Sequence, residues 1–178
     1  MKNPILVVSL VLLLCFAFGC QNKAEKAELE KFRAQVAVEE QNKALVVRYI
    51  DAWIKGDIEA LKEIFSPDHV WHSDTGQTVP FDPSFKVLKQ QIAMFSDRTI
   101  SSEDLIAKGD KVVHRYIARG VHTGATEGLP ATGNKFEVGG IEILRVENGK
   151  IVETWEVMNW QSFYEALGFE LRPKEVKK

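Results

Sequence analysis

Hydrophobic residues in the first half of the folded part recur with the spacing of a helix. Val46, Tyr49, Ile50, Trp53 and Ile54 lie three or four positions apart, so they share one face of an α-helix. The intervening positions are mostly polar or charged. The pattern predicts an amphipathic helix whose apolar face packs on a core.

Two further helices follow this first one. Gly56 is a stop signal, and Asp57 can cap a short second helix over residues 58–65, which ends at Ser66-Pro67. A brief extended segment comes next, at residues 70–72. Asp82-Pro83 then opens a third helix, with apolar residues on one face.

Beyond residue 98 the hydrophobic period changes from that of a helix to that of a strand. Gly139-Gly140 suggests a bulge or bend, and Asn148-Gly149 is a strong signal for a two-residue hairpin. Asn159 can cap a closing helix. The predicted strands cover residues 99–107, 111–123, 135–147 and 151–158.

Helices followed by an antiparallel meander indicate the α+β class. We expect a conical fold, in which the N-terminal helices pack on a strongly curved, mainly antiparallel sheet. The concave face of such a sheet can stay partly empty, which predicts a central pocket.

The composition fits one globular domain with an apolar ligand. The chain has 178 residues, 45% of them hydrophobic and 27% charged, which is enough for one sizeable core. Ten Phe, four Trp and three Tyr can serve a core and also an apolar or aromatic pocket. The net charge of −2 argues against nucleic acid as a partner.

The first 19 residues have the layout of a secretory signal. Lys2 is followed by a nearly unbroken apolar run from Ile5 to Phe18, too short to span a bilayer comfortably. Residues 17–20 (AFGC) resemble the lipobox of bacterial lipoproteins, which implies cleavage before Cys20 and its lipidation. The protein would then be exported and anchored to a membrane at the bacterial cell envelope. A plain signal peptide and an uncleaved anchor are the alternatives.

The remaining chain divides into three parts. Residues 20–40 are rich in Lys, Glu, Ala and Gln and predict a polar helical spacer. The folded domain is expected over 41–172, followed by a charged tail at 173–178. No cysteine follows Cys20, so neither a disulfide framework nor a cysteine metal site is expected.

Four short motifs follow one another in the second half of the chain. They are residues 119–124 (RGVHTG), 128–133 (GLPATG), 140–145 (GIEILR) and 148–155 (NGKIVETW). In this order they resemble the G-x-H-x-G, P-x-T-G, I-x-x-x-R and G-K-I-x-E-x-W patterns of the SnoaL-like polyketide (ester) cyclase family, which has a conical fold like that of nuclear transport factor 2. The similarity extends over about residues 41–170.

The resemblance implies acid-base chemistry on a small, partly apolar oxygenated molecule. Such cyclases carry a carboxylic acid four residues after the last tryptophan, where it serves as acid and base in an intramolecular aldol closure. Here Asn159 stands at that distance from Trp155, and an amide cannot exchange a proton near neutral pH. This departure makes catalysis doubtful, and the cap of the closing helix is an equally good interpretation of Asn159.

Other residues could contribute to catalysis or ligand binding. His122 occupies the family's G-x-H-x-G position and His72 follows Trp71, so the two histidines are the catalytic candidates. Trp71, Trp155, Asn159 and Glu153 are the candidates for ligand contact. Core packing is the alternative for Trp155, and a salt-bridged carboxylate is the more ordinary interpretation of Glu153. His69 and His114 carry no such motif and are interpreted as structural or surface residues.

No pattern of a metal or cofactor site occurs in the chain, so none is expected. The functions left open are an enzyme (a cyclase, isomerase, dehydratase or hydrolase) and a non-catalytic lipoprotein that binds a hydrophobic ligand. A homodimer is a third expectation, because one strand alternates apolar and basic residues on a face. That face consists of Val113, Arg115, Ile117, Arg119 and Val121.

Overall fold

A computed structural model describes residues 4–126, 129–170 and 172, with side chains from residue 23 onward. The chain divides into two compact units after Val38. Among the described residues, no helix combines the length and the apolar character needed to cross a bilayer. The side chain of Cys20 and the tail at 173–178 lie outside the described part, so the lipidation and the tail stay predictions.

One long helix begins the chain. Helix α1 (Pro4–Lys55) is continuous and runs through the predicted leader and spacer into the predicted domain. Within the first unit, Leu29, Phe32 and Val36 are exposed. Within the second unit, Leu45, Val46, Ile50 and Ala52 are buried in the core, as the 3.6-residue period predicts.

Two of the three shorter helices begin at the predicted caps, and the third begins at Phe81, just before its predicted start at Asp82-Pro83. Helix α2 (Ile58–Ile64) starts with the Asp57 carboxylate accepting a hydrogen bond from the Ala60 N–H at 3.0 Å. Helix α3 (Phe81–Met94) follows the second strand directly. Helix α4 (Trp160–Ala166) is capped by Asn159, whose side chain accepts a hydrogen bond from the Ser162 N–H at 3.1 Å.

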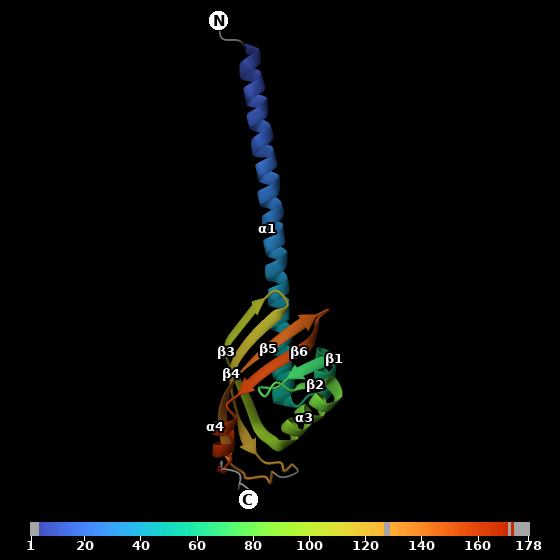
Figure 1. Cartoon of the computed structure of the whole chain (residues 1–178), viewed down its shortest axis with the longest axis vertical. Coiled ribbons are helices and arrows are strands. Elements are labelled where there is room, and N and C mark those ends of the chain that lie inside the picture. The colour runs from blue at the N-terminus through green and yellow to red at the C-terminus, as the bar shows by residue number, and fades with distance from the viewer. Residues whose placement is uncertain (1–3, 127–128, 171, 173–178) are drawn as a thin grey trace, which may run out of the picture. The chain divides into compact units, whose positions relative to one another are not determined.

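Six strands form one curved sheet in the order β2-β1-β6-β5-β4-β3 (Figure 1). Strands β1 and β6 pair in parallel, and the other neighbours are antiparallel. The α+β class and the mainly antiparallel curved sheet are therefore confirmed, whereas β2 had no signal in the hydrophobic pattern. The strands are β1 (Phe65–His72), β2 (Thr78–Pro80), β3 (Phe95–Lys108), β4 (Lys111–His122), β5 (Lys135–Glu147) and β6 (Lys150–Met158).

The hairpin prediction is confirmed, and the predicted bulge lies elsewhere. Asn148 and Gly149 both have positive φ, 52° and 72°, and connect β5 to β6. The ladder between β4 and β5 runs through Gly139 and Gly140 without interruption. Between β5 and β6 the register shifts, since Arg145 pairs with Glu153 but Val146 pairs with Ile151. Val152 is thus an additional residue on β6, and it reverses which later side chains face inward.

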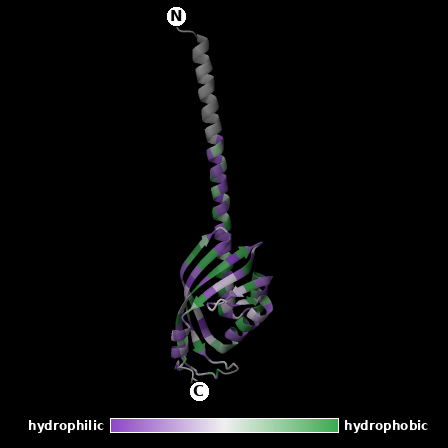
Figure 2. Cartoon of the chain, in the orientation of Figure 1, coloured by the Kyte–Doolittle hydropathy of each residue, from purple (hydrophilic) through white to green (hydrophobic). Residues whose placement is uncertain are grey.

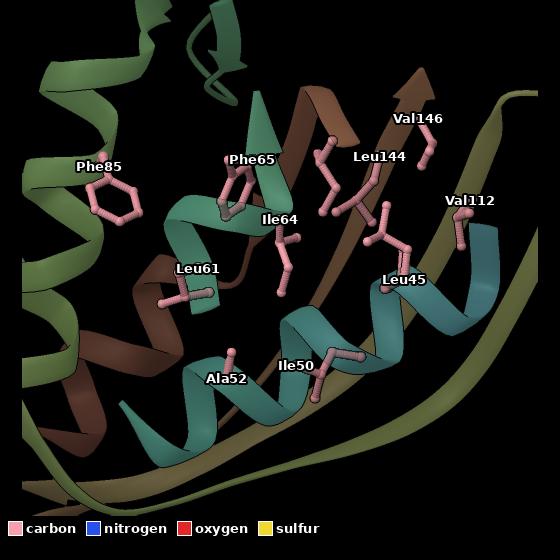
Figure 3. Packing of buried hydrophobic residues seen from close by; sticks show 12 residues of the cluster. Leu45, Ile50, Ala52, Leu61, Ile64, Phe65, Phe85, Val112, Leu144 and Val146 are labelled. Atoms are coloured by element: carbon pink, nitrogen blue, oxygen red, sulfur yellow. The ribbon is translucent and has the colours of Figure 1, made fainter. Parts of the chain in front are cut away.

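The buried hydrophobic residues form two clusters on the inner face of the sheet. Along the strands, hydrophobic and hydrophilic residues alternate, as Figure 2 shows by colour. The first cluster joins α1, α2 and α3 to β1 and the adjoining ends of β4, β5 and β6. Leu61 and Leu144 of this cluster are fully buried (Figure 3). The second cluster joins β3, β4 and β5 to α4 and contains Phe95, Phe136 and Phe163.

Arg98 holds the ends of two helices together. Its guanidinium donates hydrogen bonds to the carbonyl oxygens of Ile92 at 2.6 Å and Phe95 at 2.5 Å, at the end of α3. It also donates to those of Trp53 at 3.3 Å and Ile54 at 3.1 Å, in the last turn of α1. The last carbonyls of a helix have no partner within the helix, so one cation satisfies both ends.

Candidate functional site

A cavity of about 510 Å³ lies between the inner face of the sheet and the helices of the second unit. Its size suits a small organic ligand. Its polar lining residues are Tyr49, His69, Gln77, Ser84, Gln91, Tyr116, Glu142, Thr154 and Glu156. The rest of the wall is mostly aromatic and aliphatic, including Trp53, Phe65, Trp71, Phe81, Phe85, Phe95, Phe136, Trp160, Phe163 and Tyr164.

The register of the sheet places two carboxyl groups opposite each other in this wall. Glu142 on β5 pairs with Glu156 on β6, and His114 on β4 pairs with Glu142 on its other side. Side chains directly opposite each other on neighbouring strands lie close together on the same face. The three residues therefore form a row across β4, β5 and β6, which we call the His114–Glu142–Glu156 row.

Glu156 is the member of the row whose protonation is most affected by its surroundings. Burial and the neighbouring charge of Glu142 raise the pKa of its carboxyl from 4.5 to about 7. The Tyr116 hydroxyl donates a hydrogen bond to its Oε1 at 2.5 Å, and the Trp71 side chain donates another; both oppose the rise. Glu156 can therefore exist in either protonation state near neutral pH, as a general acid or base requires.

Glu142 also has a hydrogen-bond partner on the side away from Glu156, toward β4. Its Oε1 lies 2.9 Å from Nδ1 of His114, and the side chains of both residues are almost fully buried. Nε2 of His114 lies 2.9 Å from the Ser102 hydroxyl on β3. Tyr49 on α1 also hydrogen-bonds Glu142, and burial together with the two carboxylates raises the pKa of this phenol well above its usual value. Tyr49 is therefore a hydrogen-bond donor at neutral pH.

His69 is another polar residue of the cavity wall. Its side chain is buried against Phe65, with ring centroids 4.8 Å apart, and its Nε2 lies 3.0 Å from the Thr154 hydroxyl. Burial lowers the pKa of His69 to about 4, so the ring is neutral at neutral pH. A neutral imidazole can bind a polar ligand group but cannot serve as a cation there.

Three of the predicted site residues lie together, but not in the cavity wall. The His72 and Trp155 rings stack, with centroids 4.8 Å apart and planes 3° apart. Glu153 forms an ion pair with Arg145 at 2.5 Å and lies 3.2 Å from Nε2 of His72. The Arg145 hydrogen bond is the main reason for the lowered pKa of Glu153. The ordinary interpretation of Glu153 as a salt-bridged carboxylate is therefore confirmed.

The remaining predicted residues are distributed between the cavity and other parts of the domain. Trp71 lines the cavity and contacts Glu156. His122 is fully buried, with Nδ1 3.2 Å from the Thr132 hydroxyl, and is not among the lining residues. Asn159 caps α4, as its alternative interpretation predicted, and is also outside the lining. Any role of His72, His122, Trp155, Asn159 and Glu153 in function stays a prediction.

The sequence contained a signal for Glu142 and His114 that motif reasoning did not use. On β5 the buried hydrophobic residues are Phe136, Val138, Leu144 and Val146, and Glu142 lies an even number of positions from each of them. Strict alternation therefore places Glu142 inside the fold, and the same reasoning on β4 places His114 there. Alternation does not predict the direction of Glu156. Strict alternation from the buried Ile151 would point Glu156 outward, but the additional residue at Val152 turns the later even-numbered side chains of β6 inward.

Comparison with known proteins places the chain in a family. The family model for the SnoaL-like polyketide cyclases matches residues 43–167. A similar solved structure is that of AclR, a proposed hydroxylase from Streptomyces galilaeus, with 28% identity, 76% of this chain and 87% of that chain covered, and a TM-score of 0.68. Another is IdmH, a proposed polyketide cyclase from Streptomyces antibioticus, with 30% identity, 72% and 99% covered, and a TM-score of 0.64.

A more distant solved structure shares the fold alone. It is an epoxide hydrolase of the LEH-like type from M. tuberculosis, with 10% identity, 72% of this chain and 90% of that chain covered, and a TM-score of 0.59. Among curated proteins, none matches this chain. The family match extends over most of the second unit and agrees with the conical architecture and the motif order. The chain belongs to the SnoaL-like polyketide cyclase family.

Proposed function

We propose that the protein binds a small, largely apolar oxygenated molecule in the cavity and catalyses a cyclase-related reaction, with Glu156 as general acid and base. The observation that carries this proposal is that Glu142 and Glu156 lie directly opposite each other on β5 and β6 in a largely aromatic cavity wall. Two facing carboxyl groups in an apolar site favour holding one proton between them. Such a pair can accept a proton and return it without help from solvent.

The proposed reaction is an intramolecular aldol closure. The Glu156 carboxylate removes a proton from a carbon next to a carbonyl group, which leaves an enolate. The enolate carbon attacks a second carbonyl of the same molecule, so one carbon–carbon bond forms and the attacked oxygen becomes an alkoxide. The protonated Glu156 then gives its proton to the alkoxide, and the carboxylate is restored.

Two tyrosines assist in this proposal. Burial and the nearby carboxylates Glu156 and Glu142 raise the pKa of the Tyr116 hydroxyl well above its usual value, so it remains a donor through the cycle. Its bond to Glu156 orients the carboxyl group at the cavity wall. Tyr49 donates the corresponding hydrogen bond to Glu142. Hydrogen-bond donors already in place stabilise charge as it develops.

The test uses an aromatic carbon acid in place of the unidentified substrate. 5-Nitrobenzisoxazole fits an apolar cavity, and its ring opens to a coloured phenolate when a base removes its C–H proton. The full-length protein should accelerate the opening, and Glu156→Gln should lose most of that acceleration, since general bases contribute about 10²–10⁴-fold. Equal rates for the two proteins would reject Glu156 as the base.

Asn159→Asp is the matched comparison for that test. It introduces the carboxylate that the family resemblance implies at this position, and Asp remains a good helix cap. Because Asn159 lies outside the cavity lining, the substitution should leave the rate unchanged. A large gain on Asn159→Asp would instead assign the chemistry to position 159.

A carrier without catalysis is the second candidate function. The amide at position 159 and the lipobox-like leader favour an anchored protein that holds a hydrophobic compound at the cell envelope. A ligand that binds the native state raises its stability. 2-Naphthol should then raise the melting temperature of both the native protein and Glu156→Gln, while neither opens the benzisoxazole ring. Ring opening that requires Glu156 would exclude a purely passive carrier.

A further inference from the structure

The cavity extends well beyond Glu142 and Glu156, which we call the carboxyl pair. Glu142 and Phe136 both line the cavity, and they lie six residues apart on the same face of β5. Because a strand advances about 3.3 Å per residue, the lining covers roughly 20 Å along this strand. One end of the cavity therefore carries the carboxyl pair, and the other end lies against Phe136.

The far end of the cavity consists of three aromatic rings from separate elements. They belong to Phe95 on β3, Phe136 on β5 and Phe163 on α4, and all three line the cavity. The ring centroid of Phe95 lies 4.8 Å from that of Phe136 and 5.8 Å from that of Phe163, and the last two lie 5.3 Å apart. These side chains contain no polar atom, so this Phe95–Phe136–Phe163 group suits the apolar part of a ligand.

Two aromatic rings lie across the sheet on the way from one end to the other, each above a glycine of the neighbouring strand. Tyr116 on β4 pairs with Gly140 on β5, and a Cβ on Gly140 would lie 2.5 Å from the Tyr116 ring. Phe136 on β5 pairs with Gly120 on β4, and a Cβ on Gly120 would lie 2.9 Å from the Phe136 ring. Each ring thus occupies the space that the side chain of its partner residue would need.

Ala118 lies between these two rings. It stands on the inner face of β4, two residues after Tyr116 and two before Gly120. It is 7% exposed and lines the cavity. Of all the described residues in the cavity lining, Ala118 has the smallest side chain. The wall is therefore lowest at Ala118, and this position leaves space between the two rings.

We propose that Ala118 is a specificity-determining residue, which sets how long a ligand can be when its oxygenated end lies at the carboxyl pair. With a methyl group at this position, an elongated ligand passes between Tyr116 and Phe136 and reaches the Phe95–Phe136–Phe163 group. A larger side chain fills the passage and leaves room for short ligands alone. The inference rests on the proposed function for the place of the oxygenated end. It adds the class of ligand, an elongated apolar molecule with its oxygen atoms at one end.

The test measures the binding of 4-alkylphenols to the full-length protein by isothermal titration calorimetry. The phenol hydroxyl suits the carboxyl pair, and the chain grows by one methylene at a time from 4-methylphenol to 4-heptylphenol. Burial of each methylene should raise the affinity of the native protein about fourfold. In Ala118→Leu, 4-methylphenol should bind as it does to the native protein, but the rise should stop partway along the series. 4-Heptylphenol should then bind this variant at least about tenfold more weakly than it binds the native protein.

Two further variants complete the series. Val121→Leu enlarges a side chain on the outer face of the same strand, so it is the control and should bind every phenol as the native protein does. Ala118→Val introduces a smaller, β-branched side chain that suits a strand. It should weaken the binding of 4-heptylphenol in the same direction, and it decides alone if Ala118→Leu does not fold.

Equal affinities of the native protein and the Ala118 variants for every phenol would overturn the proposal. So would a native protein that binds none of the phenols, or whose affinity does not rise along the series. An equal loss for all phenols in Ala118→Leu would also overturn it, because position 118 would then affect the whole cavity and not the length of the ligand.

The ring-opening assay separates this inference from the proposed function. 5-Nitrobenzisoxazole is short, so Ala118→Leu should still open it at the native rate. A native protein that shows the expected phenol series but opens no benzisoxazole would keep this inference and reject catalysis by Glu156. Ring opening that requires Glu156, together with equal phenol affinities in the native protein and Ala118→Leu, would reject this inference alone.

Discussion

At the scale of single residues, Glu156 makes stability depend on pH. Its pKa is 4.5 in the unfolded chain and about 7 in the folded protein, so the folded state holds a proton that the unfolded state releases between these values. The contribution of Glu156 to the free energy of unfolding therefore falls as pH rises from about 4.5 to 7. His69, with its pKa lowered to about 4, acts oppositely and loses stability as pH falls below 6.5.

Because the two effects overlap, the native protein must be compared with a variant. Glu156→Gln removes only the carboxyl titration, so its stability relative to the native protein should increase as pH rises from 4.5 to 7. Urea unfolding at a series of pH values measures this difference. Parallel stability curves for the two proteins would show that the Glu156 pKa is not raised in the folded state.

At the scale of elements, the neighbouring glycines Gly139 and Gly140 on β5 differ in the space available for a side chain. A Cβ on Gly140 would lie 2.4 Å from the Tyr116 hydroxyl oxygen and 2.5 Å from the ring, whereas a Cβ on Gly139 would have its nearest neighbour at 3.8 Å. Gly140→Ala should therefore displace Tyr116 from Glu156 and cost about 1–3 kcal/mol. Gly139→Ala should change stability by less than about 0.5 kcal/mol. Chemical unfolding of both variants makes the comparison, and equal stabilities would contradict the packing of Tyr116 on Gly140.

Arg98 provides a second prediction at this scale. Burial lowers the pKa of its guanidinium, yet four carbonyl oxygens at the ends of α1 and α3 accept its hydrogen bonds. Arg98→Ala should cost roughly 3 kcal/mol, because several carbonyls lose their donor. Arg119→Ala, which breaks an exposed pair with Glu137, should cost at most about 1 kcal/mol. Thermal unfolding measures both, and a mild effect at Arg98 would mean that water replaces the guanidinium.

Local sequence rules predicted the elements better than they predicted the site. The caps at Asp57 and Asn159 and the hairpin at Asn148-Gly149 depend only on near neighbours, and all three are confirmed. The inward direction of Glu156 depends on an additional residue at Val152, which is visible only once β5 and β6 are paired. The role of Arg98 likewise requires two helices that are distant in the chain. Pairing and packing of distant segments thus determine the site.

At the scale of the whole molecule, membrane attachment remains a proposal from the sequence. If Cys20 is lipidated after cleavage, the protein should occur in the membrane fraction, and Cys20→Ala should abolish this association. The measurement is fractionation of cells expressing each protein, with mass spectrometry of the mature N-terminus. A Cys20→Ala protein that still sediments with membranes, or a native protein with an intact leader and no acyl mass, would contradict the proposal.

The pH dependence of benzisoxazole ring opening tests the central claim most directly, because it joins the cavity, the carboxyl pair and the chemistry in one measurement. A general base works in its ionised form, so the rate should rise with pH and level off above a midpoint of about 7, the pKa of Glu156. Glu156→Gln should lack this transition. A midpoint near 4.5 in the native protein, or an unchanged transition in Glu156→Gln, would show that another group performs the proton transfer.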